Sequence, residues 1–160
     1  MLAIFGNESE STWEAAKALG ILGSKRAVAR LIKILSEAED EEKRVTAAYS
    51  PGLLGDSRSL APLLNVLNDR DLSPKLRSHA AEALGYLKDK RAFDILSSEI
   101  KDASPEVRYS IAFSLGEIGD RRALPELERL AATDDAAASA GTIREMAQEA
   151  IRSINSVPGD

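Results

Sequence analysis

The strongest constraint on this chain is an internal repeat about 32 residues long. A glycine recurs at steps of 32, 33 and 31 residues, and an arginine follows six residues after each one. The two columns are Gly20, Gly52, Gly85 and Gly116, and Arg26, Arg58, Arg91 and Arg122. A further arginine column comes earlier in each unit, at Arg44, Arg77, Arg108 and Arg144. A fixed period of this length indicates one supersecondary unit stacked several times.

Each unit is predicted to be a pair of helices, here called helix A and helix B. Ser73 and Pro74 are typical of the first positions of a helix A, and Gly85 is expected to end it at about Leu84 in a left-handed conformation. Aspartates after the glycines, such as Asp89 and Asp120, are expected to cap helix B. Helix B then carries apolar residues at helical spacing. In order they are Val28, Leu31, Ile32 and Leu35; Leu60, Leu63, Leu64 and Leu67; Phe93, Leu96 and Ile100; and Leu124, Leu127 and Leu130.

Composition supports an all-helical fold and excludes several classes of protein. Aromatic residues make up 4% of the 160 residues and apolar residues 44%, so the core must consist mainly of Ala, Leu, Ile and Val. The absence of cysteine excludes disulfides and thiolate metal sites. The net charge of −5 argues against nucleic-acid binding, which needs an excess of Lys and Arg. No apolar run is long enough to span a membrane, and we expect a cytoplasmic protein.

The segments Leu76–Ala92 (LRSHAAEALGYLKDKRA) and Val107–Ala123 (VRYSIAFSLGEIGDRRA) resemble HEAT-like repeats of the phycobilisome (bilin) lyase subclass. The resemblance implies one domain over residues 1–160, a right-handed α-solenoid of stacked antiparallel helical hairpins. Roughly four repeats are expected, over residues 9–38, 40–69, 73–102 and 104–133, with a C-terminal capping helix over 142–155. In this family helix A lies on the convex side and helix B on the concave side.

Three features depart from the repeat or close its ends. Pro51 replaces a helix-compatible residue in the second unit and should end or kink that helix a turn early. The connector Ala131–Gly141 is longer than its counterparts and is expected to extend a helix or form a mobile loop. Ser11 with Glu14, and Thr142 with Glu145, fit the capping box at the start of a terminal helix.

Outward positions of helix B are the candidate partner-binding residues on the expected concave face. This face begins basic, passes through a partly apolar middle and ends with mixed charge, which suits a peptide or protein better than DNA. An ordinary solvated face explains the same pattern equally well. The candidates are Arg30, Lys33, Pro62, Asn65, Asp94, Ile95, Ser98, Glu126 and Arg129.

The remaining conspicuous residues favour structural roles. The Asp-x-Arg motif recurs in every unit, so we interpret it as a helix cap plus an arginine that ties adjacent hairpins. The Arg44 column is expected to bridge turns between repeats. Tyr49 and Phe113 share one register of helix A, where packing is favoured over a contact patch. His79 is the only histidine, and we expect no metal site, cofactor or catalytic residue.

The leading hypothesis is a non-catalytic scaffold that binds an unidentified protein partner on the concave face. The alternative, which rests on the resemblance, is a bilin lyase-like subunit acting on a phycobiliprotein. A nucleic-acid module is disfavoured by charge. We expect a monomer or weak self-association, because Leu2, Ile4 and Phe5 leave one end of the array incompletely capped.

Overall fold

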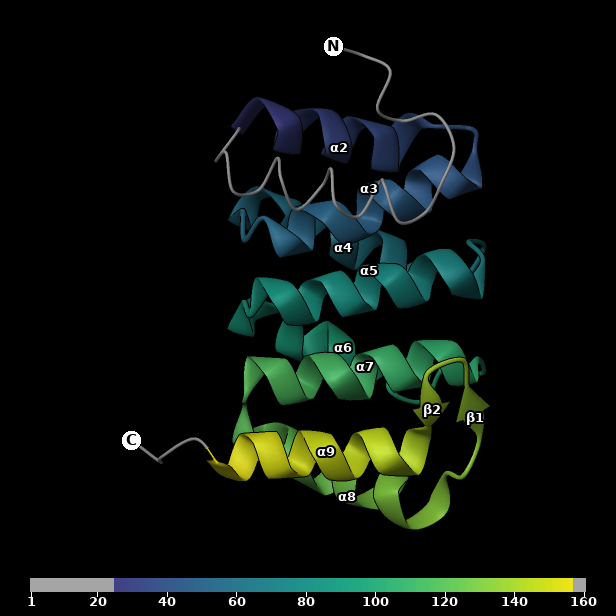
Figure 1. The fold of residues 1–160 in the computed structure, drawn as a ribbon, viewed down its shortest axis with the longest axis vertical. Coiled ribbons are helices and arrows are strands. Elements are labelled where there is room, and N and C mark those ends of the chain that lie inside the picture. Colours follow the sequence, from purple (N-terminus) through teal and green to yellow (C-terminus); the bar gives the residue numbers. More distant parts are fainter. Residues whose placement is uncertain (1–24, 157–160) are drawn as a thin grey trace.

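The computed structural model describes residues 25–156. Helical hairpins stack in chain order along its long axis, from α2 at one end to α8 and α9 at the other (Figure 1). The A helices are α3 (Glu41–Leu53), α5 (Pro74–Leu87), α7 (Pro105–Ile118) and α9 (Ile143–Ser156). The B helices are α2 (Lys25–Glu37), α4 (Leu60–Asn68), α6 (Phe93–Glu99) and α8 (Leu124–Thr133). The predicted all-α solenoid is confirmed.

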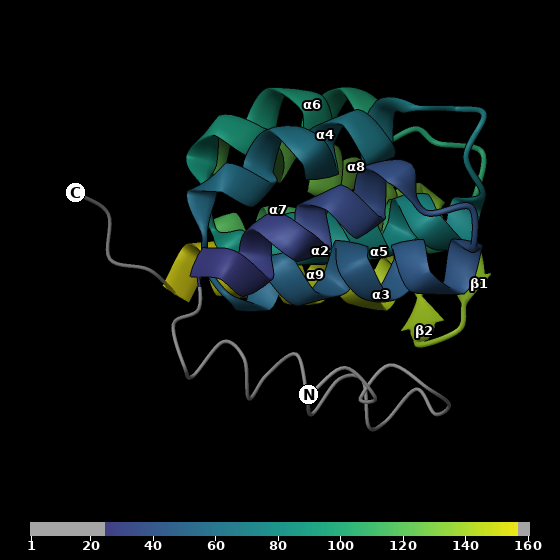
Figure 2. The same cartoon turned by 90° about the horizontal axis from the view of Figure 1, so that it is seen from above.

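The helices form two layers. Seen along the stack, α3, α5, α7 and α9 superpose on one side, and α4 and α6 lie on the other (Figure 2). Consecutive A helices pack closely along their length, whereas consecutive B helices contact one another much less. The core lies between the layers, where Leu63, Leu96 and Leu127 of the B helices are fully buried.

Glycines inside the A helices make this close packing possible. A Cβ at Gly52 would lie 2.3 Å from the carbonyl oxygen of Ala83, and one at Gly116 would lie 2.8 Å from Cα of Ala150. Because both obstacles are backbone atoms of the next A helix, no side chain can be accommodated without moving a helix.

The prediction that Gly85 and Gly116 end their helices is therefore wrong. Both are buried within α5 and α7, which continue to Leu87 and Ile118. The left-handed residues that end these helices are Lys88, with φ of 53°, and Gly119, with φ of 73°. In the part of the chain that the structure describes, the recurring glycines Gly52, Gly85 and Gly116 serve helix packing rather than termination.

The repeated aspartates cap a short turn between the two helices of each hairpin. Side chains of Asp56, Asp89 and Asp120 accept the amide N–H groups of Arg58, Arg91 and Arg122 at 3.0 Å. Each aspartate begins a three-residue 3₁₀ turn, and the B helix follows it directly. The predicted aspartate cap is therefore present, but it caps the 3₁₀ turn that precedes helix B rather than helix B itself.

Two departures from the repeat have defined structures. Helix α3 continues through Pro51 to Leu53, so the proline does not end it a turn early, which was one of its two predicted effects. The connector Ala131–Gly141 begins by extending α8 to Thr133, as one alternative predicted. It then leads into an antiparallel pair of two-residue strands, β1 (Ala137–Ala138) and β2 (Gly141–Thr142).

The C-terminal capping box is confirmed. Thr142 Oγ1 accepts the amide of Glu145 at 3.3 Å, and Glu145 Oε2 accepts the amide of Thr142 at 3.1 Å. Ser73 caps α5 as predicted, by accepting the amide of Leu76, but the Ser104 side chain makes no such bond to α7. The predicted Ser11–Glu14 box, Gly20, and the apolar residues Leu2, Ile4 and Phe5 lie outside the described residues.

Candidate functional site

Two arginines of the early column, Arg77 and Arg108, form salt bridges that we call latches. Each latch joins an arginine in the first turn of an A helix to an aspartate that follows the B helix of the same hairpin. Arg77 pairs with Asp102, and Arg108 pairs with Asp134 at 2.7 Å. Arg108 Nη1 also donates to the carbonyl oxygens of Asp102 and Ala103, in the turn that precedes its own helix. The expectation that these arginines bridge turns between repeats is met here.

Asp102 is the most enclosed charged group of the latches. Its side chain is 0% exposed and that of Arg77 is 7% exposed. Burial raises the pKa of Asp102, but hydrogen bonds from Arg77 and from the Ser104 amide, with the nearby charge of Arg70, bring the net pKa below its ordinary value. A hydrogen bond from Arg108 lowers the pKa of Asp134 in the same way.

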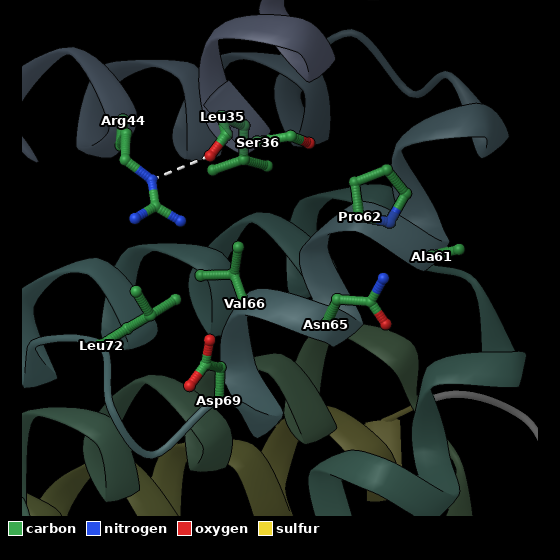
Figure 3. Close-up of a pocket in the computed structure, with 9 residues that line it drawn as sticks. All are labelled: Leu35, Ser36, Arg44, Ala61, Pro62, Asn65, Val66, Asp69 and Leu72. Carbon is green, nitrogen blue, oxygen red and sulfur yellow. Dashed lines mark hydrogen bonds between the residues drawn. The ribbon is translucent and has the colours of Figure 1, made fainter. Parts of the chain in front are cut away.

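The second hairpin has the same two residue types but no closed latch. Asp69 follows Arg44 by 25 residues, as Asp102 follows Arg77, and no salt bridge joins Arg44 to Asp69. Arg44 Nε instead donates to the carbonyl oxygen of Leu35 at the end of α2, at 2.9 Å. An open pocket of about 380 Å³ lies there between α2 and α4 (Figure 3). Its lining includes Pro62 and Asn65, two of the predicted partner-binding residues.

All nine predicted partner-binding residues lie on B helices within the described residues, and we call their outward surface the B-helix face. Six of them are exposed: Arg30, Lys33, Asn65, Asp94, Ser98 and Arg129. Pro62, Ile95 and Glu126 are half-buried, so Pro62 and Ile95 are less exposed than their outward positions predict. Ile95 is held back because it also packs against the core beneath it.

Several charges on this face are paired with neighbours. Glu126 accepts a hydrogen bond from Arg129 at 2.7 Å, which lowers the pKa of Glu126. Lys33 lies 3.8 Å from Glu37, and Asp94 lies 3.8 Å from Arg122 of the next hairpin. Such exposed pairs contribute little to stability, so these side chains can exchange partners at low cost.

Arg122 partly fulfils the role predicted for the Asp-x-Arg motif. Its guanidinium lies 4.0 Å from the centre of the Phe93 ring in the preceding hairpin, as well as 2.7 Å from Asp120 in its own turn. Within the described residues, Arg91 forms its ion pair with Asp89, in the same turn. The motif is therefore primarily a cap that orients its own arginine, and Arg122 also ties two hairpins.

The A-helix side carries an aromatic row that the sequence only partly indicated. The rings of Tyr49, Tyr86 and Phe113 meet edge to face, with centroids 5.6 and 5.3 Å apart across α3, α5 and α7. Tyr86 donates to Glu82, and burial together with the hydroxyl of Tyr49 raises the pKa of Tyr86. This contact explains Tyr49 and Phe113 as packing between helices. The sequence analysis did not identify Tyr86, because it lies one helical turn after Glu82, the residue of α5 that shares the register of Tyr49 and Phe113.

His79 lies beside this row and has a local partner. Its Nδ1 is 2.7 Å from the carbonyl oxygen of Lys75, one turn earlier in α5. Among residues 25–156 no group of three or more His, Asp or Glu side chains is arranged to hold a metal ion. The same part of the chain contains no helix that is long and apolar enough to cross a membrane.

Known structures share this architecture. A subunit in the complex of CpcE and CpcF of phycocyanin lyase from Nostoc sp. PCC7120 matches with a TM-score of 0.74 and 21% identity. The match covers 92% of this chain and 93% of that one. A computationally designed armadillo repeat protein for modular peptide recognition matches with a TM-score of 0.56 and 19% identity, over 94% of this chain and 78% of that one. Comparison with curated protein sequences gives no match.

These comparisons correct one prediction from the sequence. The expectation that the chain is not an enzyme is contradicted, because the PBS lyase HEAT-like repeat profile matches residues 13–37 and a phycocyanin lyase subunit shares the fold. That expectation rested on the single histidine and the absence of cysteine, which argue only against catalytic sites built from those residue types.

Sequence profiles identify the repeats themselves. The profile for HEAT repeats matches residues 60–152, which is more than half of the 160-residue chain. The matched segment begins at α4 and includes α5 to α8 and most of α9. The chain belongs to the HEAT repeat family.

Proposed function

We propose that this chain is a lyase-type subunit that binds a phycobiliprotein on its B-helix face while a bilin is attached to that protein. The observation that carries the proposal is the B-helix face itself, where side chains from four successive helices remain accessible. The similar phycocyanin lyase structure is a complex of two subunits, which supports a second subunit as part of the active assembly.

The chemistry of the B-helix face suits a protein surface. Arg30 and Lys33 on α2 are exposed cations, whereas Glu126 and Arg129 on α8 form a pair of opposite charges. Between them, Pro62 and Ile95 present half-buried apolar surface. Apolar surface flanked by charged side chains is the usual composition of a protein–protein interface.

The other side of the molecule is less suitable for a large partner. Tyr49, Tyr86 and Phe113 already contact one another there, so part of their apolar surface is used within the chain. The B helices contact one another less than the A helices do, which leaves shallow space between neighbouring helices for the side chains of a partner.

The test is a reconstitution with purified components. The chain is mixed with apo-phycocyanin and free bilin, with and without a second lyase subunit, and covalent attachment is measured as visible absorbance that survives denaturation. Complex formation with apo-phycocyanin is measured in parallel by size-exclusion chromatography. The variant combines Arg30→Glu, Lys33→Glu and Ile95→Asp, and the control is Arg152→Glu on the exposed side of α9.

Attachment of bilin by the wild type and the control, with loss of the complex in the triple variant, is the expected result. Binding without attachment in any combination would contradict the lyase role. Equal binding by the triple variant and the wild type would contradict the assignment to the B-helix face.

A further inference from the structure

The open latch lacks the arginine–aspartate salt bridge that the two closed ones have. Asp69, Asp102 and Asp134 adopt the same local turn, since each accepts the amide N–H two residues later, at 3.0, 2.8 and 3.2 Å. The aspartate of the second hairpin is therefore already oriented as in the closed latches. The arginines differ in what their terminal nitrogens reach. Arg44 and Arg77 both donate from Nε to a main-chain carbonyl oxygen, but a terminal nitrogen of Arg77 reaches Asp102 and none of Arg44 reaches Asp69.

This arrangement leaves polar atoms of Arg44 and Asp69 free to bind a ligand in the pocket. Among residues 25–156, the terminal nitrogens of Arg44 and the second carboxylate oxygen of Asp69 have no hydrogen-bond or ion-pair partner. Figure 3 shows the guanidinium and the carboxylate pointing into the same space from opposite sides, with Val66 between them. The side chain of Asn65 also lines this pocket.

The rest of the lining is largely apolar. Leu35, Pro62, Val66 and Leu72 surround the polar groups. An isolated carboxylate would bind Arg44 but would face the like charge of Asp69, and an isolated cation would face Arg44. A neutral group with both a donor and an acceptor satisfies both charges, and the apolar lining favours a hydrophobic side chain beside it.

We propose that the open latch binds an extended peptide segment of a protein partner. One main-chain carbonyl of the segment accepts from Arg44, a main-chain N–H donates to Asp69, and an adjacent apolar side chain enters the space lined by Pro62, Val66 and Leu72. The inference deepens the proposed function, since the pocket opens on the B-helix face and supplies a specific contact there.

The test uses a phage-displayed library of random linear dodecapeptides selected against the full chain. Synthetic copies of the selected peptides are measured against the wild type, Asp69→Asn and the control Arg152→Gln. Asp69→Asn is the informative variant because asparagine can still accept the amide of Asp71, so the turn is kept while the free acceptor becomes a donor. Thermal unfolding by circular dichroism checks that the variants remain folded.

The expected result is a set of peptides sharing an apolar residue, with Kd raised about tenfold by Asp69→Asn and unchanged by Arg152→Gln. N-methylation of one peptide amide should weaken binding to the wild type about as much. The same N-methylation should have little further effect on Asp69→Asn, because both changes remove the same hydrogen bond.

Three results would overturn the inference. They are peptides that depend on a shared Asp or Glu, peptides whose affinity is equal for Asp69→Asn and Arg152→Gln, and a selection that yields no binder to the wild type. Because phycocyanin and bilin are absent from this experiment, it can succeed where the reconstitution fails, and the reverse.

Discussion

The A-helix layer and the outer side of the B helices differ in how much space they leave for side chains. In the A layer, neighbouring backbones approach so closely that Gly52 and Gly116 have no room for a methyl group. Outward positions on the B helices, such as Arg30 and Lys33, are exposed and have space around them. This contrast indicates where the sequence can vary. Side chains can change on the B-helix face without disturbing the stack, which is what a binding surface requires.

The closed Arg77–Asp102 latch resembles the A layer, because its side chains are enclosed by neighbouring residues. Asp102 is completely buried beside Arg77, and the residues that form these pairs recur with the repeat. The open latch is the exception, since Arg44 and Asp69 are each accessible and are not paired with each other. The residues that form a structural contact in the other repeats therefore line a pocket on the proposed binding face in this one.

Loss of a buried latch carboxylate should have the largest effect. Asp102→Ala leaves the buried guanidinium of Arg77 without its counter-charge, and we expect a loss of about 4 kcal/mol in the free energy of unfolding. Asp94→Ala removes an exposed carboxylate from the B-helix face and should cost less than about 0.5 kcal/mol. Urea unfolding measures both. Similar losses for the two variants would contradict the distinction between the regions.

Addition of one methyl group to the A layer should have the next largest effect. In Gly52→Ala the new Cβ would meet the backbone of Ala83, and we expect a net loss of about 2 kcal/mol after the roughly 1 kcal/mol gain in helix propensity. The control, Ala29→Leu, adds a larger group at an exposed position of α2 and should leave the urea midpoint almost unchanged. A stabilising Gly52→Ala would show that the A helices can move apart freely.

Acid should weaken the closed latches and thus reduce the contrast between the two regions. The pKa of Asp134 is lowered in the folded protein, so its contribution to stability is complete above its unfolded pKa of about 3.9 and is lost as pH falls through the folded value. Asp134→Asn should therefore be less stable than the wild type at pH 7, by about 1 kcal/mol, with the difference disappearing at low pH. Urea unfolding from pH 7 to strongly acidic solution measures it. A difference independent of pH would mean that charge plays no part in this latch.

Features encoded locally could be predicted from the sequence. The apolar spacing of the B helices and the Thr142–Glu145 capping box depend on residues close in the chain, and the repeat period can be counted directly. All three are present in the structure. The role of Gly85 was not predictable in this way. A glycine that ends a helix and a glycine that admits a neighbouring helix look alike in a single sequence, and only the contact with Ser114 distinguishes them.

The candidate site was predicted in part. Outward positions of the B helices follow from helical periodicity, so Arg30 and Asn65 were found, whereas the half-burial of Ile95 depends on packing from another layer. The latch aspartates were missed, although Asp69 and Asp102 follow their arginines by 25 residues and Asp134 follows by 26. That spacing was the available signal. The same spacing occurs in the open latch and in a closed one, so the sequence does not indicate which latch is open.

The smallest expected effect on stability is also the sharpest test of the comparison. Arg30→Glu with Lys33→Glu reverses two exposed charges on α2, and Lys33 has only a long contact of 3.8 Å with Glu37 to lose. We expect the urea midpoint to stay within error of the wild type, because exposed ion pairs contribute little. Binding of apo-phycocyanin should nevertheless weaken and lose much of its dependence on salt concentration, since the reversed charges no longer attract carboxylates on the surface of the partner. Titration at low and high salt, with Arg152→Glu as the charge-matched control on α9, separates this from an effect of net charge. A double variant that unfolds easily, or one that binds with unchanged salt dependence, would mean that the B-helix face is part of the scaffold rather than a surface free for recognition.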